Sequence, residues 1–518
     1  MKRIIAFVLS FVMAFGISFT VFASTTTPVT GYNLTINNLT GVTEINMYNL
    51  VKMEKEDGKI KYTLNQPKYN DIFTELGVTT VKQLSSKDSK TVLAAVQKKL
   101  GASMPDQTVS ATGSEAAKVI NDAAGYYYIT MSGDDGTVYN PILVLVPETE
   151  NDTYKNVTVN AKSNKPGITK TVKENMSYGK KSNADIGDVV DFKVEIDVPK
   201  YASHVEDNTV KLQVTDKMSK GLTWLDNQAV TVTDGVTPIA GALKTGSPVV
   251  VRGLSDTTIT FDLDYSKVKG KNKVVLEYKA LLNENAVIGT ADNNNAAKLT
   301  YTTNPFTTTE FTTAEDKTFV YSYGLDLTKA ELGHKDIVLK GAEFELSKDG
   351  NGKYYFIEKT DHYIAISSDK YNFVPEGGAF KAVPKVASDG LTELTGLKDK
   401  VVSSDSGKII IKGLDAGTYT LTETKAPDGY YKVRESIEFE IKDESTADIS
   451  GKVATGGETG NEAATADAYY HKTIFNSTNY VLPLTGDNGA LVIIVSGVIM
   501  LLAACSLFWI IRKKSADK

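Results

Sequence analysis

The sequence predicts a mainly β protein built from tandem immunoglobulin-like β-sandwich domains, with some helix in the N-terminal domain. Short alternating apolar segments, separated by Gly, Asn and Asp, recur over residues 163–479, as expected for the strands of β-sandwiches. The chain has 518 residues, and the roughly 460 residues between its two apolar ends favour three domains over one.

The N-terminus has the pattern of a secretory signal peptide. Lys2 and Arg3 precede an uncharged apolar run over residues 4–22, and Ala23 ends a stretch that suits the small-residue cleavage site. We therefore expect residues 1–23 to be removed on export.

An apolar segment near the C-terminus predicts a membrane anchor. Residues 490–511 carry no charge, and as a helix they would span about 33 Å, enough to cross the hydrocarbon core. The basic tail, residues 512–518, favours a cytoplasmic end by the positive-inside rule. Everything before residue 490 is therefore expected outside the cell.

The composition limits the partners and the covalent chemistry. The net charge of -6 is mild and both signs are interspersed, which favours neither nucleic acid nor an anionic membrane as a partner. The single cysteine, Cys505, lies inside the apolar segment. The exported part therefore has no disulfide, and any covalent staple in it must come from other chemistry.

Turn-rich joints divide the exported part into three segments. Residues 24–162 mix strand patterns with a helical stretch over about residues 71–100. Residues 163–305 begin at a Ser-Asn-Lys-Pro-Gly joint and have strand patterns throughout. Residues 318–479 have the same character, with a hairpin signal at Asp-Gly-Asn-Gly, residues 349–352.

In the third segment, polar residues stand on strand faces that are otherwise apolar. Glu423 shares its face with Tyr419 and Leu421. Lys329 follows two leucines at the same alternating spacing, and Asn476 follows an isoleucine. A carboxylate buried without a partner is costly, so we expect Glu423 to be protonated or paired in the core.

The second segment repeats this pattern. Lys170, Asp216 and Asn295 each lie on a strand face whose other residues are apolar. Asn293 lies on the same face as Asn295, so either asparagine suits the third place. Ordinary polar residues at strand edges are the alternative interpretation of all three.

Both segments resemble domains of known families. The run YTLTETKAPDGY, residues 419–430, resembles the E-box of Cna B-type domains, and the second segment resembles the middle domain of shaft pilins. In these families a buried lysine attacks an asparagine side chain, ammonia leaves, and an acid that hydrogen-bonds the amide carbonyl shuttles the protons. A plain buried salt bridge between lysine and acid is the alternative. The resemblance implies two isopeptide bonds and their promoting acids: Lys329–Asn476 with Glu423, and Lys170–Asn295 with Asp216.

The pentapeptide Leu482-Pro483-Leu484-Thr485-Gly486 stands just before the apolar segment. Together with that segment and the basic tail, it resembles the Leu-Pro-x-Thr-Gly sorting signal of sortase substrates. The resemblance implies that a transpeptidase cuts between Thr485 and Gly486 and transfers the acyl group of Thr485 to an amine.

Residues 154–162, YKNVTVNAK, resemble the pilin motif of shaft subunits, in which a Val-x-Val strand leads to the acceptor lysine. Lys162 falls in the place of that lysine. Asn160 and Ala161 replace the usual Tyr-Pro, and the usual upstream Trp is absent. Lys165 is near enough to compete, and an ordinary solvated linker lysine is the alternative interpretation.

Taken together, the resemblances imply the major shaft subunit of a sortase-assembled Gram-positive pilus, secreted and anchored to the cell wall. The protein would be a substrate and not an enzyme, apart from the single-turnover formation of its own isopeptide bonds. The implied partners are a sortase, identical subunits, ancillary tip and base pilins, peptidoglycan at the fibre base and, through adhesion, a host or matrix surface. No cofactor or metal is expected. A wall-anchored monomeric adhesin with Cna-type domains is the alternative.

Overall fold

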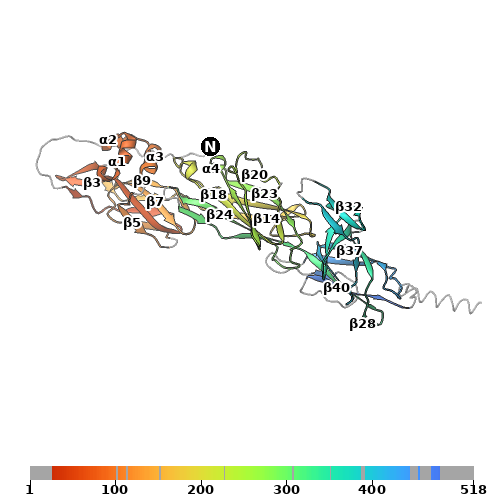
Figure 1. Cartoon of the computed structure of the whole chain (residues 1–518). Coiled ribbons are helices and arrows are strands. Elements are labelled where there is room, and N and C mark those ends of the chain that lie inside the picture. Colours follow the sequence, from red (N-terminus) through yellow and green to blue (C-terminus); the bar gives the residue numbers. More distant parts are fainter. Residues whose placement is uncertain are drawn as a thin grey trace, which may run out of the picture.

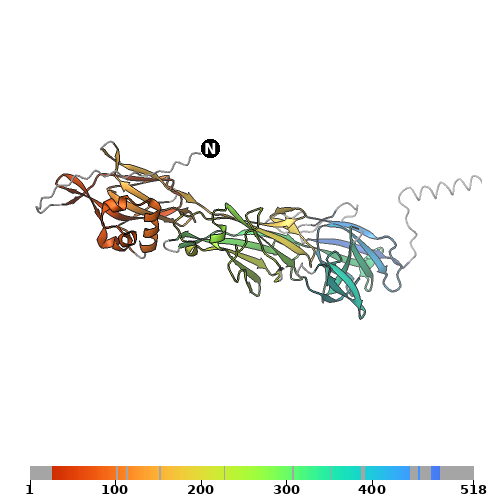
Figure 2. The ribbon, with the colours of Figure 1, turned by 90° about the horizontal axis from the view of Figure 1, so that it is seen from above.

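The computed structural model describes residues 26–100, 103–112, 115–150, 153–226, 228–305, 309–349, 352–386, 391–443, 453–455 and 468–478. Three β-rich units follow one another along a long axis (Figures 1 and 2), which confirms the predicted mainly β, multi-domain fold class. The expected signal peptide, sorting motif, membrane segment and basic tail lie outside the described residues. Within the described ranges, no helix is long and apolar enough to cross a membrane.

The N-terminal unit has three layers. Its elements are β1 (Thr27–Pro28), β2 (Leu34–Asn37), β3 (Val42–Glu56), β4 (Lys59–Leu64), α1 (Gln66–Leu76), α2 (Val81–Ser85), α3 (Ser89–Leu100), β5 (Gln107–Ser110), β6 (Ala117–Ile120), β7 (Gly125–Gly133), β8 (Val138–Tyr139), β9 (Ile142–Val146), β10 (Glu148–Glu150), β11 (Thr153–Lys155), β12 (Val157–Asn160) and β13 (Ser163–Asn164).

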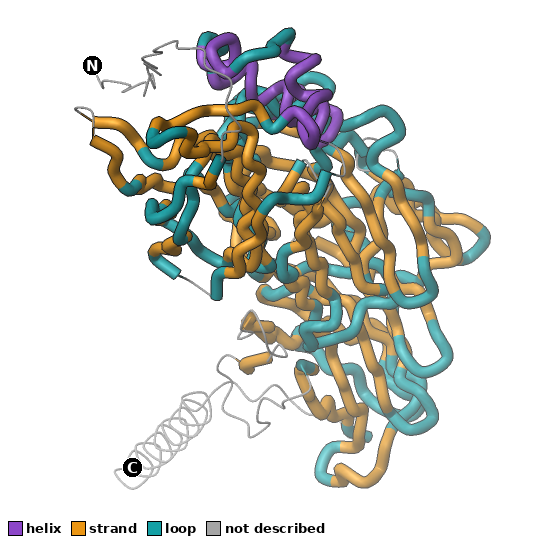
Figure 3. Tube along the Cα trace, turned by 90° about the vertical axis from the view of Figure 1, so that its left-hand side faces the viewer, coloured by secondary structure: helices purple, strands orange, loops and turns teal. Residues whose placement is uncertain are grey.

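Alternation along β3 builds the layers of this unit. β3 is central in a sheet of order β1-β3-β7-β9, which β4 and β5 extend. Tyr48 and Leu50 pack with the helices, whereas Ile45 and Met47 pack with the small sheet β12-β2-β6 on the opposite face. The helices consequently gather on one side of the unit (Figure 3).

The predicted helical stretch, residues 71–100, is confirmed but consists of three helices. Gly77 ends α1 in the left-handed conformation, with φ of 64°. Thr80 then caps α2 through a capping box with Gln83. Asp88 accepts a hydrogen bond from the backbone N–H of Thr91 (2.9 Å) in the first turn of α3. These local signals divide the stretch.

The middle unit is a two-sheet sandwich. One sheet has the order β15-β14-β17-β23-β19 with β20 on β23, and the facing sheet has the order β16-β26-β24-β18-β22-β21 with β25 on β24. Its elements are β14 (Ile168–Glu174), β15 (Ser177–Gly179), β16 (Lys181–Asn183), β17 (Val189–Asp197), η1 (Asp207–Thr209), β18 (Leu212–Ser219), β19 (Leu222–Trp224), β20 (Thr231–Thr233), β21 (Val249–Arg252), β22 (Asp256–Asp262), α4 (Tyr265–Val268), β23 (Lys273–Leu282), β24 (Asn294–Asn304), β25 (Thr309–Thr312) and β26 (Asp316–Tyr321).

The middle sandwich extends further along the chain than the sequence suggested. β26 pairs antiparallel with β24 and parallel with β16, and so completes the sheet of the middle unit. The boundary expected over residues 305–318 therefore falls inside this unit, and the pairing places it at Ser322. The alternation of apolar and polar residues in a strand shows which face is buried, but it does not show which sheet the strand joins. The sequence therefore could not assign β26 to the middle unit.

The third unit is a sandwich whose sheets continue into one another through a hairpin. The strand order is β28-β27-β36-β31-β30-β29-β37-β38-β39, with β40 on β27 and β35 on β29. β32-β33-β34 form a separate small sheet. Its elements are β27 (Tyr323–Glu331), β28 (His334–Val338), β29 (Glu343–Lys348), β30 (Gly352–Glu358), β31 (Tyr363–Ser367), β32 (Tyr371–Glu376), β33 (Ala379–Pro384), β34 (Leu394–Leu397), β35 (Val401–Val402), β36 (Lys408–Leu414), β37 (Gly417–Lys425), β38 (Ile437–Asp443), β39 (Val453–Thr455) and β40 (Tyr469–Asn476).

Close packing joins the middle and third units. Asp185 of the middle unit is buried and accepts hydrogen bonds from the Tyr354 hydroxyl (2.8 Å) and the backbone N–H of Asp415 (2.7 Å). Gly413 lies against Ile186 so closely that a Cβ there would be 2.8 Å from the isoleucine side chain. The two units therefore meet at a fitted interface.

We expect this interface to weaken as the pH rises. Burial, and then the charge of Asp188, raises the pKa of Asp185 well above its usual range. The folded state therefore holds a proton that the unfolded chain loses above about pH 4, so stability falls with rising pH, by at most about 1.4 kcal/mol per pH unit. Thermal unfolding between about pH 5 and about pH 8 should show this slope.

The variant Asp185→Asn should flatten that pH dependence, because the side chain no longer titrates. Asp191→Asn is the matched control, since Asp191 belongs to a partly exposed ion pair with Lys173 (3.6 Å). An equal slope in Asp185→Asn and in the unaltered chain would contradict the role of Asp185.

Candidate cross-link sites

The third unit buries a lysine, a carboxyl and an amide together. Lys329 on β27 is 1% exposed, and Glu423 on β37 and Asn476 on β40 are each 2% exposed. β27 and β40 run parallel with Lys329 opposite Ile474, so Asn476 lies two residues further along β40 on the same face. The predicted inward direction of all three side chains is confirmed.

Glu423 contacts both the lysine and the amide. Its Oε1 lies 3.7 Å from Lys329 Nζ, and its Oε2 accepts a hydrogen bond from Asn476 Nδ2 (3.0 Å). Lys329 Nζ also donates to the backbone carbonyl of Ile474 (3.1 Å). Burial lowers the pKa of Lys329 to about 8, although the charge of Glu423 opposes the shift. The neutral amine is therefore more accessible here than in an exposed lysine, and it lies next to an amide.

The segment after β37 fixes the acid and the amide, and sequence reasoning missed it. The carbonyl of Tyr431 accepts a hydrogen bond from Asn476 Nδ2 (2.6 Å), and the N–H of Val433 donates to Glu423 Oε2 (2.6 Å). These contacts are made by backbone groups, which every residue carries, so no residue type in the sequence indicates them. The only available signal was the Pro-Asp-Gly turn after Ala426, which returns the chain toward the core.

The middle unit buries a second lysine. Lys170 lies on β14 of one sheet, whereas Asp216 on β18 and Asn295 on β24 lie on the facing sheet, and all three are 0% exposed. Lys170 Nζ lies 2.5 Å from Asp216 Oδ2. Asn295 lies opposite Met218 in the strand pairing. It is therefore the diagonal neighbour of Asp216, which lies two residues before Met218 on the same face of β18. Within the described residues, Lys170 and Lys329 are the only buried lysines.

Tyr278 on β23 completes the middle cluster and was not predicted. Its hydroxyl accepts a hydrogen bond from Lys170 Nζ and donates to Asp216 Oδ2. Asn295 Nδ2 lies 3.4 Å from the same hydroxyl. Alternation places Tyr278 in the core, but tyrosine is common there, so its sequence pattern gives no sign of these contacts.

Electrostatics in the middle cluster resemble those of the third unit. Burial lowers the pKa of Lys170, and the charge of Asp216 acts in the opposite direction. The rings of Phe192 and Tyr278 lie beneath the amine, with centroids 5.1 and 5.0 Å from Nζ. These rings exclude water from the amine, which disfavours its charged form, while their faces attract a cation and act in the opposite direction.

The structure separates Asn295 from Asn293. The Nδ2 of Asn293 donates to the carbonyls of Val287 (2.7 Å) and Val320 (3.1 Å), and its Oδ1 accepts from the N–H of Val287 (2.8 Å). Asn293 is thus occupied in holding a turn. Asn295 is the asparagine that lies in the lysine cluster.

Four buried oxygens in the two clusters have no hydrogen-bond partner among the described residues: Asp216 Oδ1, Asn295 Oδ1, Glu423 Oε1 and Asn476 Oδ1. Native proteins leave few such atoms, so their gathering around the two lysines requires an explanation. The amide nitrogen of Asn476, and not its carbonyl as the resemblance implied, faces the acid. In the third unit the acid therefore lies beside the nitrogen that would leave in an amide exchange.

Lys162 lies exposed between β12 and β13, near the start of the middle unit. Its backbone carbonyl accepts a hydrogen bond from the N–H of Asn140 (2.9 Å), and the preceding Ala161 is buried, so the backbone is held. The competing Lys165 forms an ion pair with Asp135 (3.1 Å). Of the two lysines, Lys162 is the one whose amine forms no ion pair within the described residues.

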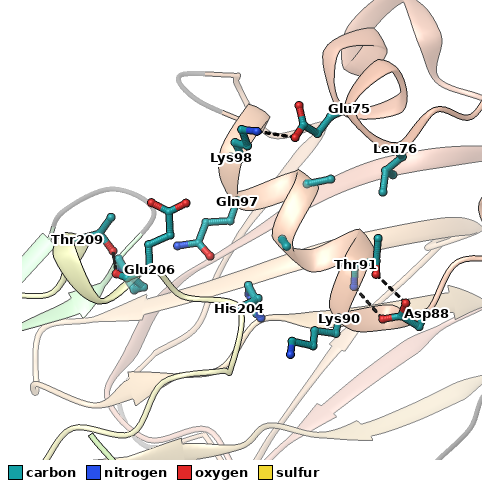
Figure 4. Close-up of a pocket in the computed structure, with 13 residues that line it drawn as sticks. Glu75, Leu76, Asp88, Lys90, Thr91, Gln97, Lys98, His204, Glu206 and Thr209 are labelled. Carbon is teal, nitrogen blue, oxygen red and sulfur yellow. Dashed lines mark hydrogen bonds and ion pairs between the residues drawn. The ribbon is translucent and has the colours of Figure 1, made fainter. Parts of the chain in front are cut away.

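A pocket of about 770 Å³ opens between α3 and the segment before β18 (Figure 4). Charged residues of both signs line it, and Lys98 forms an ion pair with Glu75 (2.6 Å). None of the residues predicted from the sequence as site residues lines this pocket. It is therefore separate from both lysine clusters.

Comparisons with known proteins agree with this architecture. Residues 186–305 match the family described as Gram-positive pilin backbone subunit 2, Cna-B-like domain, and residues 325–454 match the SpaA prealbumin-like fold domain. The chain is 23% identical over 440 residues to the trypsin-resistant surface T6 protein of Streptococcus pyogenes serotype M6, covering 76% of this chain and 79% of that protein.

The same fold occurs in a solved structure. The T6 backbone pilin of serotype M6 Streptococcus pyogenes, described as a modular three-domain structure, superposes with a TM-score of 0.59 at 17% identity over 88% of this chain and 100% of that one. The full-length major pilin SpaD of Corynebacterium diphtheriae gives a TM-score of 0.49 at 18% identity over 87% and 98%.

The fold and the two buried clusters define a modular surface protein of tandem pilin-type sandwiches. Within that class, the matched domains and the similarity to the T6 protein support a Gram-positive major pilin, a structural subunit of surface pili. They favour this assignment over a monomeric adhesin.

Proposed function

We propose that this pilin cross-links itself through Lys329–Asn476 and Lys170–Asn295 isopeptide bonds. The observation that carries the proposal is the burial of each lysine against an acid and an amide, at 2% exposure or less for every member. An unreacted buried ion pair contributes little to stability, because desolvation offsets the attraction. Conversion of the lysine and asparagine side chains to a neutral amide removes the desolvation cost of the buried charges.

The chemistry balances with the residues present. In the third unit, Lys329 gives one proton to Glu423, and the neutral amine attacks Cγ of Asn476. The bond from Cγ to Nδ2 breaks, and a second proton from the attacking nitrogen passes through Glu423 to Nδ2, so ammonia leaves. Glu423 ends protonated beside a neutral amide, which suits its buried position. Asp216 has the same role for Lys170 and Asn295.

The intact mass of the exported chain should be lower than the sequence mass by one ammonia for each bond. Asn295→Ala and Asn476→Ala should each restore one ammonia mass, and Asn476→Ala should also lower the stability by about 5 kcal/mol, because a loop of this length is no longer closed. Asn293→Ala is the matched control and should keep both bonds. A mass equal to the plain sequence in the unaltered chain would refute both.

We further propose that a sortase polymerises the pilin through Thr485 and Lys162. The enzyme would cut between Thr485 and Gly486, within the signal that begins at Leu482 and Pro483, and pass the acyl group to Lys162 of the next subunit. The exposed amine of Lys162 on a held backbone supports this assignment. At the fibre base the same acyl group would join peptidoglycan, with ancillary tip and base pilins completing a fibre that adheres to a host or matrix surface.

Lys162→Arg in the native host should abolish the high-mass ladder on denaturing gels, because a guanidinium does not replace an amine nucleophile. Lys165→Arg should leave the ladder unchanged, since that side chain is held by Asp135. If instead Lys165→Arg removes the ladder and Lys162→Arg does not, the acceptor assignment is reversed.

The positions of the two bonds determine which segments carry tension in the fibre. Tension entering at Lys162 would pass across Lys170–Asn295 and Lys329–Asn476, so residues 171–294 and 330–475 are bypassed. In the third unit Lys329 and Asn476 lie on the first and last strands, but β25 and β26 follow Asn295 in the middle unit. Residues 163–169 and 296–328 would therefore bear the load.

Stretching a single chain between residues 162 and 478 should release residues 296–328, since the other loaded segment, residues 163–169, is short and already largely in strands. The added length should stay below about 120 Å, because a residue spans at most about 3.6 Å. Asn476→Ala should add a second, much longer event as the third unit unfolds. A long event in the unaltered chain would show that the third unit is not bypassed.

A further inference from the structure

The ring of Tyr278 is clamped by three aromatic side chains in the core of the middle unit. Its centroid lies 6.0 Å from that of Phe192 in a stacked arrangement, 5.4 Å from Phe261 and 5.5 Å from Trp224. The side chain is 2% exposed. This clamp fixes the hydroxyl at one place, between Lys170, Asp216 and Asn295.

The two clusters differ in how the acid reaches the amide. In the third unit, Glu423 accepts a hydrogen bond directly from Asn476 Nδ2 (3.0 Å). In the middle unit the acid is an aspartate, shorter by one methylene. Among the described residues, the hydrogen bond of Asn295 Nδ2 goes to the Tyr278 hydroxyl (3.4 Å), which in turn donates to Asp216 Oδ2. The hydroxyl fills the gap between a short acid and the amide.

We propose that Tyr278 is a catalytic residue of cross-linking in the middle unit, whose hydroxyl carries a proton from Asp216 to the leaving amide nitrogen of Asn295. This inference rests on the proposed Lys170–Asn295 bond. The hydroxyl contacts the attacking nitrogen, the acid and the leaving nitrogen, which are the three atoms between which protons must move.

The proton balance closes with Tyr278 unchanged. Lys170 first gives a proton to Asp216, and its amine attacks Cγ of Asn295. As the bond from Cγ to Nδ2 breaks, Tyr278 gives its proton to Nδ2 and takes one from Asp216, so ammonia leaves. Asp216 then takes the second proton of the attacking nitrogen and ends neutral. One bond to Cγ forms, one breaks, and no other reactant is needed.

The surroundings keep the phenol protonated and ready to donate. Burial, and then the charge of Asp216, raises the pKa of Tyr278 well above its ordinary value. A phenolate is therefore disfavoured as a resting state, and the hydroxyl acts as a relay that receives a proton when it gives one. Acid–base catalysis of this kind contributes about 10²-fold to 10⁴-fold in rate.

The test follows both bonds in the same full chain. The chain is made in a cell-free reaction, quenched at intervals and digested, and the two cross-linked peptides are quantified by mass spectrometry. Tyr278→Phe should slow the Lys170–Asn295 bond by about a hundredfold or more. The Lys329–Asn476 bond, whose acid contacts the amide directly, should keep its rate and serves as the internal control.

Tyr301→Phe is the matched control variant. It also removes a buried hydroxyl from the middle unit, one that donates to the carbonyl of Gly136 (2.6 Å), away from the lysine cluster. It should leave both rates unchanged. Adding Asp216→Glu to Tyr278→Phe should restore much of the lost rate, because the longer acid can reach the amide directly, as Glu423 does.

A fluorinated tyrosine at position 278 provides a variant that keeps the shape of the ring while making the phenol more acidic. A proton relay predicts a changed rate for the middle bond only, whereas a packing role predicts no change. Equal rates in Tyr278→Phe, fluorotyrosine and the unaltered chain would overturn the role of Tyr278 while leaving the cross-link intact. A missing Lys170–Asn295 bond in the unaltered chain would instead overturn the proposed function itself.

Discussion

The burial of a lysine amine against a carboxyl is the constraint on which both pilin-type sandwiches depend. Lys170 and Lys329 lie in cores that are otherwise apolar, at 0% and 1% exposure. Keeping such charges out of water is expensive, and apolar residues of similar volume would often be as stable. The arrangement therefore makes physical sense as a reactive one. Residues 1–489 contain no cysteine, so no disulfide is available there, and the proposed amide bonds between side chains would serve as the covalent cross-links instead.

The two units reach this arrangement through different topologies. In the third unit the first and last strands, β27 and β40, are parallel neighbours, so lysine and asparagine share one sheet and the acid comes from the other. In the middle unit the lysine lies on one sheet, and the acid and asparagine on the other. The acid then comes from a strand next to that of the amide, and no hydrogen bond between Asp216 and Asn295 is found among the described residues. A tyrosine from the lysine's own sheet completes the contact.

Much of this site was predictable because a strand has a period of two. Placing Lys329, Glu423 or Asn476 on an apolar face fixes its inward direction without any knowledge of the fold. The two-residue period does not show which strands pair with one another. β26 was therefore assigned to the wrong unit, and the contacts of Tyr278 were not foreseen. The backbone groups of Tyr431 and Val433 were missed for a related reason, since every residue carries them.

The absence of a comparable cluster in the N-terminal unit fits the position of the acceptor lysine. Among the described residues before Lys162, no lysine is buried, and the unit is held by packing on both faces of its central sheet. In the proposed fibre, tension enters at Lys162, which follows this unit in the chain. The N-terminal unit would then lie outside the load path, and ordinary packing is sufficient for it. In this proposal covalent cross-links are needed only where force passes, and the two buried lysines of the described residues lie on that path.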